Sequence, residues 1–204
     1  MEVRPHDLVW VNDPQAIVIE SELPEWLNQI DYHQLPMVVR REQLPRQFVP
    51  VGIRGRQRAE RLAVKIKLRN IIQVVTPESL INHVAIGQLP SHFRDSLQAL
   101  RDYLSGWQWG ITGSCGYQIA SGIVSLSTKS DLDLLIRCPI YTDYKQLVAI
   151  NQFAQHQPCR IDIQIQTPYG GFVLNEWIRE QRVLLRTATG PILTHNPWCI
   201  GKEY

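Results

Sequence analysis

Three aspartates stand where they can act together on a divalent cation. Asp131 and Asp133 flank Leu132, and the segment then becomes wholly apolar. In a strand, this alternation puts the two carboxylates on one face, and the Leu-Leu-Ile run that follows predicts that the strand enters a core. Because carboxylates this close repel each other, a pair held on a buried strand favours a divalent cation as its partner.

Asp162 stands in a second strand pattern. Residues 160–167 alternate isoleucine with polar side chains, which is the clearest strand signal in the chain. Between the two acidic segments, residues 142–157 carry apolar side chains near helical spacing, and Thr142 is the expected N-cap. The order is therefore strand, helix, strand. If the two strands are neighbours, Asp162 converges on Asp131 and Asp133.

Each acidic element also has a simpler interpretation. Asp131 and Asp133 alone would suit a solvated strand edge, and Asp162 would suit a salt bridge with Arg160. We consider the salt bridge the weaker interpretation, because adjacent residues of a strand point to opposite faces. With Gly113-Ser114 upstream and Asp162 downstream on a second apolar-backed strand, the cation site becomes the favoured hypothesis.

A possible phosphate site lies upstream, at Thr112-Gly113-Ser114. A Gly-Ser turn at the start of a helix offers backbone N–H groups to an anion. Gly113 allows close approach of the backbone, and Ser114 adds a hydroxyl donor. Cys115 follows directly. We expect it to pack at the helix start, and a catalytic thiol there is the less favoured alternative.

Gly113-Ser114, Asp131-x-Asp133 and Asp162, in this order, resemble the nucleotidyltransferase superfamily of the polymerase-beta type. A closer resemblance covers nearly the whole chain, to the malonate decarboxylase holo-acyl-carrier-protein synthases, also called phosphoribosyl-dephospho-coenzyme A transferases. It is carried by Arg4-Pro5-His6-Asp7-Leu8-Val9-Trp10, Val49-Pro50-Val51-Gly52-Ile53-Arg54-Gly55, Thr112-Gly113-Ser114, Ser130-Asp131-Leu132-Asp133-Leu134-Leu135, Asp162-Ile163-Gln164 and Gly190-Pro191-Ile192-Leu193.

The resemblance implies a set of roles. Asp131 and Asp133 would bridge two Mg²⁺ ions, and Asp162 would hold the ion that activates the nucleophile. Gly113 and Ser114 would bind the β- and γ-phosphates. The nucleophile would be a serine of the acyl-carrier protein of malonate decarboxylase. The donor would be triphosphoribosyl-dephospho-coenzyme A, and pyrophosphate would leave.

Two other functions stay open at this point. The chain could be another Mg²⁺-dependent nucleotidyltransferase, such as an adenylyltransferase, that acts on a protein or a small molecule. It could also be a partner of a carrier protein that has lost catalysis. The presence of all three expected acids, Asp131, Asp133 and Asp162, argues against a degenerate site.

A basic cluster spans residues 54–69. We predict that Arg54 and Arg56, in and after the Gly52-Ile53-Arg54-Gly55 turn, contact the triphosphate. The remaining members are a phosphate clamp, a docking face for an acidic carrier protein or an ordinary solvated face. They are Arg58, Arg61, Lys65, Lys67 and Arg69.

The pattern of elements predicts an α/β (α+β) chain with two domains. Residues 1–87 read as a small α/β domain of short strands and turns. Residues 88–204 read as a polymerase-beta-like nucleotidyltransferase domain with a mixed sheet flanked by helices. Residues 87–91 are the predicted boundary, and Ser91 is the expected cap of an amphipathic helix. The apolar stripe of that helix is Phe93, Leu97, Leu100 and Leu104.

Bulk properties exclude several classes of protein. A net charge of +2 over 204 residues is too small to predict nonspecific nucleic-acid binding. No apolar run approaches the roughly 18 residues of a membrane span, and the N-terminal residues lack a signal-peptide pattern. The four cysteines have no zinc-type or Cys-x-x-Cys spacing. We therefore expect a cytoplasmic protein with reduced thiols.

Overall fold

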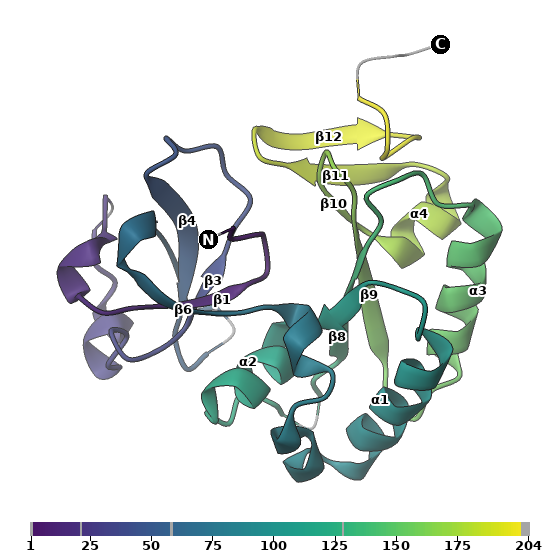
Figure 1. Cartoon of the computed structure of the whole chain (residues 1–204), viewed down its shortest axis with the longest axis horizontal. Coiled ribbons are helices and arrows are strands. Elements are labelled where there is room, and N and C mark those ends of the chain that lie inside the picture. Colours follow the sequence, from purple (N-terminus) through teal and green to yellow (C-terminus); the bar gives the residue numbers. More distant parts are fainter. Residues whose placement is uncertain (1, 21, 58, 128, 201–204) are drawn as a thin grey trace. The chain divides into compact units, whose positions relative to one another are not determined.

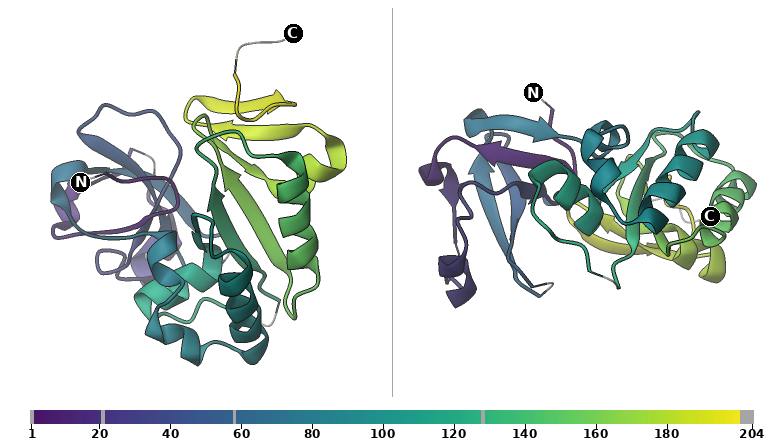
Figure 2. Two further views of the ribbon diagram at one scale, coloured as in Figure 1. Left: turned by 45° about the vertical axis from the view of Figure 1, so that its right-hand side comes forward. Right: turned by 90° about the horizontal axis from the view of Figure 1, so that it is seen from below.

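The chain divides into two compact units, Met1–Thr76 and Pro77–Tyr204 (Figures 1 and 2). The structure is a computed structural model that describes residues 2–20, 22–57, 59–127 and 129–200. Each unit contains one six-stranded sheet, and the four α-helices of these ranges all belong to the second unit. The expected mixed α/β class is therefore confirmed.

The first unit is built on an antiparallel sheet with the order β2-β5-β4-β3-β1-β6. Alternate side chains of its two longest strands are buried, as period-2 patterning dictates. Val51, Ile53 and Ile66 are almost completely buried in its core. The strands are β1 (Leu8–Val11), β2 (Ile17–Val18), β3 (Met37–Val39), β4 (Phe48–Arg54), β5 (Arg61–Lys67) and β6 (Ile71–Val75).

Two segments of this unit differ from a simple sequence interpretation. Residues 56–68, whose pattern suits a helix or a strand, contain β5, while Arg58 lies outside the described residues. Residues 23–30, where Pro24 near the first turn predicts a short helix, contain the 3₁₀ helix η2 (Glu25–Gln29). Runs this short favour 3₁₀ geometry. Two further 3₁₀ turns are η1 (Pro14–Ala16) and η3 (Leu68–Asn70).

The sheet of the second unit has the order β12-β11-β10-β9-β8-β7. Its strands are β7 (Trp109–Ile111), β8 (Leu132–Arg137), β9 (Ile161–Gln166), β10 (Gly171–Val173), β11 (Val183–Thr187) and β12 (Gly190–Thr194). β8 and β9 pair in parallel, and the other neighbouring strands of this sheet pair antiparallel. A parallel pair needs a crossover connection, and helix α3 (Tyr144–Gln155) lies within it.

The remaining helices of this unit are α1 (Ser91–Tyr103), α2 (Gly113–Ser121) and α4 (Leu174–Glu180). The predicted apolar stripe of α1 is confirmed, because Phe93, Leu97, Leu100 and Leu104 are buried. α1 lies beside α3, where the rings of Tyr103 and Phe153 stack with centroids 3.9 Å apart. No helix in the described ranges is long and apolar enough to cross a membrane.

Both predicted helix caps are wrong by one residue. Ser91 is the first helical residue of α1, and the cap position is held by Pro90 without a side-chain hydrogen bond. In α3 the cap is Asp143 rather than Thr142, and its carboxylate accepts a hydrogen bond from the N–H of Lys145 at 2.8 Å. Thr142 instead donates to the carbonyl of Ile140. Asp and Thr are both good N-caps, so the sequence alone did not decide which of these two adjacent residues caps α3.

Residues 77–88 belong to the second unit, so the boundary predicted near residue 87 falls inside it. This segment forms two 3₁₀ helices, η4 (Pro77–Leu80) and η5 (Val84–Gln88). η4 packs on β7 and α2. A Cβ on Gly110 of β7 would overlap with the backbone of Pro77, which shows how closely the two segments approach.

Candidate active site

The candidate site is built on the β8–β9 pair. In its parallel register Asp133 lies directly opposite Asp162, while Leu132 and Leu134 lie opposite Ile161 and Ile163. The acidic side chains therefore share one face and the apolar side chains the other. Asp131 precedes β8 by one residue. The sequence predicts that these acids come together on neighbouring strands. Asp133 and Asp162 do so.

The Gly-Ser turn lies against Asp133. Gly113 has a φ of +61°, which disfavours any residue with a Cβ. A Cβ at this position would also overlap with Oδ2 of Asp133. The N–H of Thr112 donates to the backbone carbonyl of Asp133 at 2.9 Å, which fixes the turn to β8. Gly113 is therefore required both by its backbone conformation and by the neighbouring carboxylate.

Helix α2 leaves this turn with Thr112 at its cap position, where the threonine side chain makes no capping hydrogen bond. The helix ends at Gly122 in the left-handed conformation. Its N-terminal end carries partial positive charge, and the Asp133 carboxylate lies against its first residue. The same end suits the phosphate role predicted for Gly113 and Ser114, which stays a prediction.

Cys115 has the packing role expected from the sequence. Its side chain is completely buried on α2. Burial, with smaller contributions from Cys159 and Asp133, raises the pKa of the Cys115 thiol to about 12. A thiol that holds its proton so tightly is a poor nucleophile. All four cysteines are free, and Cys115, Cys138 and Cys159 are buried.

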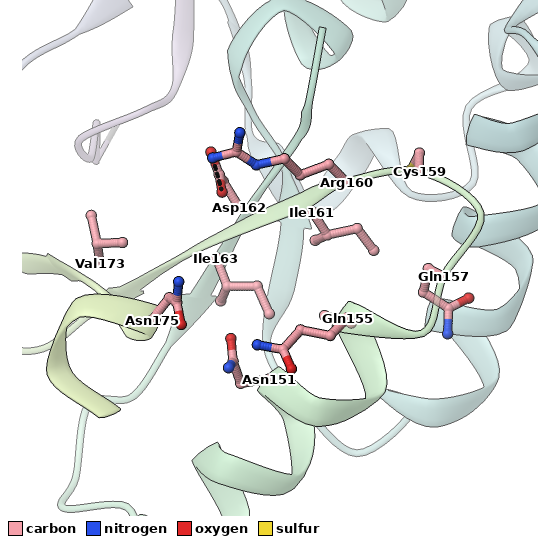
Figure 3. A pocket seen from close by; sticks show the side chains of 11 residues that line it. Asn151, Gln155, Gln157, Cys159, Arg160, Ile161, Asp162, Ile163, Val173 and Asn175 are labelled. Carbon is pink, nitrogen blue, oxygen red and sulfur yellow. Dashed lines mark ion pairs between the residues drawn. The ribbon is translucent and has the colours of Figure 1, made fainter. Parts of the chain in front are cut away.

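Arg160 pairs with two of the three acids. Its guanidinium lies 3.7 Å from Oδ1 of Asp131. It also lies 3.6 Å from Oδ1 of Asp162, the pair marked in Figure 3. The sequence argument against this salt bridge was wrong, because residues 160 and 162 are two positions apart and share a face of the strand. Arg160 thus supplies positive charge between the carboxylates.

The donor atoms suit Mg²⁺, but the side chains as they lie do not form a complete cage. Carboxylate oxygens are the ligands that magnesium takes from proteins, with water and substrate phosphate completing the shell. Within the described ranges, no group of three or more His, Cys, Asp or Glu side chains is arranged to hold a metal ion. The side chain of Arg160 is 73% exposed, so it is free to leave Asp131 and Asp162 for solvent.

Arg54 and Arg56 belong to the first unit. Arg54 ends β4 and lies opposite Arg61 of β5. Arg56, in the following turn, donates to the backbone carbonyl of Gln29 at 3.1 Å. Lys65 has a structural role, since it pairs with Glu20 and lies over the ring of Phe48 at 5.2 Å. Contact of Arg54 and Arg56 with a triphosphate stays a prediction, and Arg58 lies outside the described residues.

Sequence reasoning missed a pocket of about 350 Å³ beside Asp162 (Figure 3). Its lining includes the carboxamides of Asn151, Gln155 and Asn175. Asn151 and Gln155 are four residues apart on α3, so their shared helical face was a signal that could have been read. Nothing in the sequence places Asn175, at the start of α4, beside these two residues, because its position depends on the fold.

Comparison with known proteins assigns both units to one family. Residues 4–77 match the model of the phosphoribosyl-dephospho-CoA transferase MdcG N-terminal domain, and residues 79–197 match that of its C-terminal domain. A phosphoribosyl-dephospho-CoA transferase of Klebsiella pneumoniae is 43% identical over 198 residues, covering 96% of each chain. A protein of the same name from Pseudomonas putida strain W619 is 39% identical over 198 residues, covering 96% of this chain and 95% of that protein. No solved structure is significantly similar.

Proposed function

Because the chain belongs to the phosphoribosyl-dephospho-CoA transferase family, a family of transferases, we propose that it modifies the acyl-carrier protein of malonate decarboxylase. The group transferred is phosphoribosyl-dephospho-coenzyme A, and the donor is its triphosphate precursor. The acceptor is a serine hydroxyl of the carrier protein. The reaction is a nucleotidyl transfer that releases pyrophosphate.

The observation that carries this proposal is the opposition of Asp133 and Asp162 beside the Gly113 turn. Phosphoryl-type transfer requires positioning of the reacting groups and neutralisation of their negative charge. A turn for leaving phosphates lies next to a face of carboxylates suited to a cation, and this combination meets both requirements.

In the proposed reaction, the serine oxygen attacks the α-phosphorus of the triphosphate. A new phosphorus–oxygen bond forms to serine, and the bond from the α-phosphorus to the bridging oxygen of the β-phosphate breaks. Gly113 and Ser114 bind the departing pyrophosphate, and Asp162 accepts the serine proton. Asp162 suits this role because its side chain is 45% exposed and therefore accessible to an incoming hydroxyl.

Asp131, Asp133 and Asp162 would hold magnesium, with two ions expected. When bound, Mg²⁺ supplies activation of the attacking hydroxyl and stabilisation of the leaving phosphate charge. Arg160 must first release Asp131 and Asp162. Arg54 and Arg56 are proposed to contact the triphosphate, where their guanidinium groups would neutralise phosphate charge.

The direct test is the intact mass of the carrier protein. The chain is mixed with the triphosphoribosyl donor, Mg²⁺ and apo-carrier, and the carrier is weighed before and after. The expected gain matches phosphoribosyl-dephospho-coenzyme A, is absent when EDTA removes the metal, and accompanies one pyrophosphate per carrier. A carrier whose serine is replaced by alanine is the matched control.

Other outcomes would test the carrier substrate, the nucleotidyl transfer and the metal requirement separately. Pyrophosphate release from ATP with another acceptor, and no gain on the carrier, would keep nucleotidyl transfer and reject this substrate. Full transfer in EDTA would reject the metal and keep the substrate.

A further inference from the structure

The pocket beside Asp162 lies at an open stretch of strand edge. β10 pairs with β9 only over Gln164–Gln166 and ends at Val173, where α4 turns away. Ile161–Ile163 pair with β8 on one side and border the pocket on the other. Side chains from both faces of β9 line this pocket, which confirms that it wraps the edge of the strand. An extended ligand with amide groups can pair with such an edge as an added strand does.

Three carboxamides gather above this edge without partners. Asn151 and Gln155 reach it from α3 and Asn175 from α4, and all three turn towards Ile163 (Figure 3). Within the described ranges, the structure gives the side chains of Asn151, Gln155 and Asn175 no hydrogen bond. A carboxamide offers both a donor and an acceptor, so a ligand rich in amides is complementary to all three.

The rest of the lining narrows the chemistry of the ligand. Ile161, Ile163 and Val173 add apolar surface, while Arg160 and Asp162 line the pocket as an ion pair whose largely exposed guanidinium can turn to an anion. Pockets of about 300 to 1,000 Å³ suit small molecules, and this one, at about 350 Å³, suits part of one. The ligand group therefore combines amides, a small apolar portion and an anionic end.

We propose that this pocket binds the pantetheine arm of the dephospho-coenzyme A donor. The arm carries two amides and a geminal dimethyl group, and it joins adenosine through a diphosphate. The amides pair with Asn151, Gln155 and Asn175 and with the open edge of β9, and the diphosphate lies towards Arg160. This inference rests on the proposed function, because it takes its ligand from the donor named there.

The test compares dephospho-coenzyme A with ADP, which has the adenosine diphosphate but lacks the arm. Affinities are measured by calorimetry on the full chain with Mg²⁺, for the wild type and for the double variant Asn151→Ala/Asn175→Ala. We expect the wild type to bind dephospho-coenzyme A more tightly than ADP. Loss of two hydrogen-bonding side chains should weaken dephospho-coenzyme A about tenfold and leave ADP unchanged.

Controls separate binding from folding. Gln152→Ala removes a carboxamide of α3 that does not line the pocket, and it should change neither affinity. The single variants Asn151→Ala and Asn175→Ala lie on different helices, and each should give part of the loss, which a local folding defect of one helix cannot explain. Thermal unfolding confirms that the variants remain folded.

Two outcomes would overturn the inference. One is a double variant that binds dephospho-coenzyme A as tightly as the wild type does. The other is a wild type that binds dephospho-coenzyme A no more tightly than ADP. In both cases the carrier mass assay decides the proposed function independently, because a gain in carrier mass there would leave transfer established and only the arm pocket rejected.

Discussion

Each sheet places two like charges directly opposite each other. In the first sheet Arg54 faces Arg61 across the β4–β5 hairpin. In the second, Asp133 faces Asp162 across the parallel β8–β9 pair. Like charges so placed destabilise a sheet. Under the proposed function, the basic pair would meet phosphate and the acidic pair a metal cation, so each pair would gain a ligand of opposite sign.

The two pairs differ in how the chain creates them. The hairpin that joins Arg54 to Arg61 is local, and its register follows from its turn. The acidic pair needs a crossover through α3 before Asp162 can meet Asp133. The acidic pair therefore depends on the whole second unit, whereas the basic pair depends on one hairpin. Substitutions can test both halves of this comparison.

The largest expected effect is from Asp133→Asn. Transfer should fall about a thousandfold, because a carboxylate that holds a metal ion contributes several kcal/mol to transition-state stabilisation. Thermal stability should hold or rise, since repulsion with Asp162 is removed. Initial rates of carrier mass gain and a melting curve measure the two effects. Asp95→Asn, an exposed position on α1, is the control, and an active Asp133→Asn enzyme would reject the acidic pair as the catalytic site.

Gly113→Ala should act next most strongly. The new methyl group forces the Asp133 carboxylate aside, and a misplacement of about 1 Å can cost about a hundredfold in rate. The left-handed backbone should also cost about 1 to 2 kcal/mol of unfolding free energy. Denaturant titration and the transfer rate measure these losses. Gly87→Ala, where a Cβ meets nothing within 4 Å, should be neutral in both.

Arg54→Ala tests the basic pair. Loss of one charged hydrogen bond to phosphate should raise KM for the donor about tenfold. Steady-state kinetics with a varied donor concentration gives KM, and Arg46→Ala at an exposed position is the matched control. An unchanged KM would assign this hairpin to another role.

Arg160→Gln should give the smallest effect, in the opposite direction. The Arg160 side chain is largely exposed, so its pairing with Asp131 and Asp162 is worth at most about 1 kcal/mol. Its removal should tighten Mn²⁺ binding by up to about fivefold, measured by electron paramagnetic resonance of the free ion. Arg179→Gln, an exposed arginine that pairs with Glu180 and with none of the three aspartates, should leave Mn²⁺ affinity unchanged. Weaker Mn²⁺ binding in Arg160→Gln would reject competition between arginine and metal.

Long or strongly periodic elements were predictable from the sequence. The alternation in β9 and the apolar stripe of α1 gave these elements correctly. Four strands were missed because their patterns do not alternate: β6 has two consecutive exposed residues, β7 is buried throughout, β10 has only three residues, and β12 is largely exposed. Their conformation depends on their neighbours in the sheet.

In the candidate site, too, some features were predictable from the sequence and others depend on the fold. The positions of Asp133 and Asp162 followed from period-2 patterning and the assumption of neighbouring strands. The overlap of a Gly113 Cβ with Asp133, and the carboxamide of Asn175, depend on how separate segments approach. The pairing of Arg160 with Asp162 could have been predicted from the sequence, because residues two positions apart on a strand place their side chains on one face.

The ion pair between Glu78 and Arg137 determines where the chain can be divided for separate study. Glu78 lies on η4, at the start of the second unit, and the Arg137 side chain that it meets is only 7% exposed. A fragment that begins at residue 88 would leave this guanidinium buried without that carboxylate, at a cost of about 3 to 5 kcal/mol. A fragment that begins at Pro77 keeps the pair. Biochemical dissection of this enzyme should therefore cut the chain before Pro77.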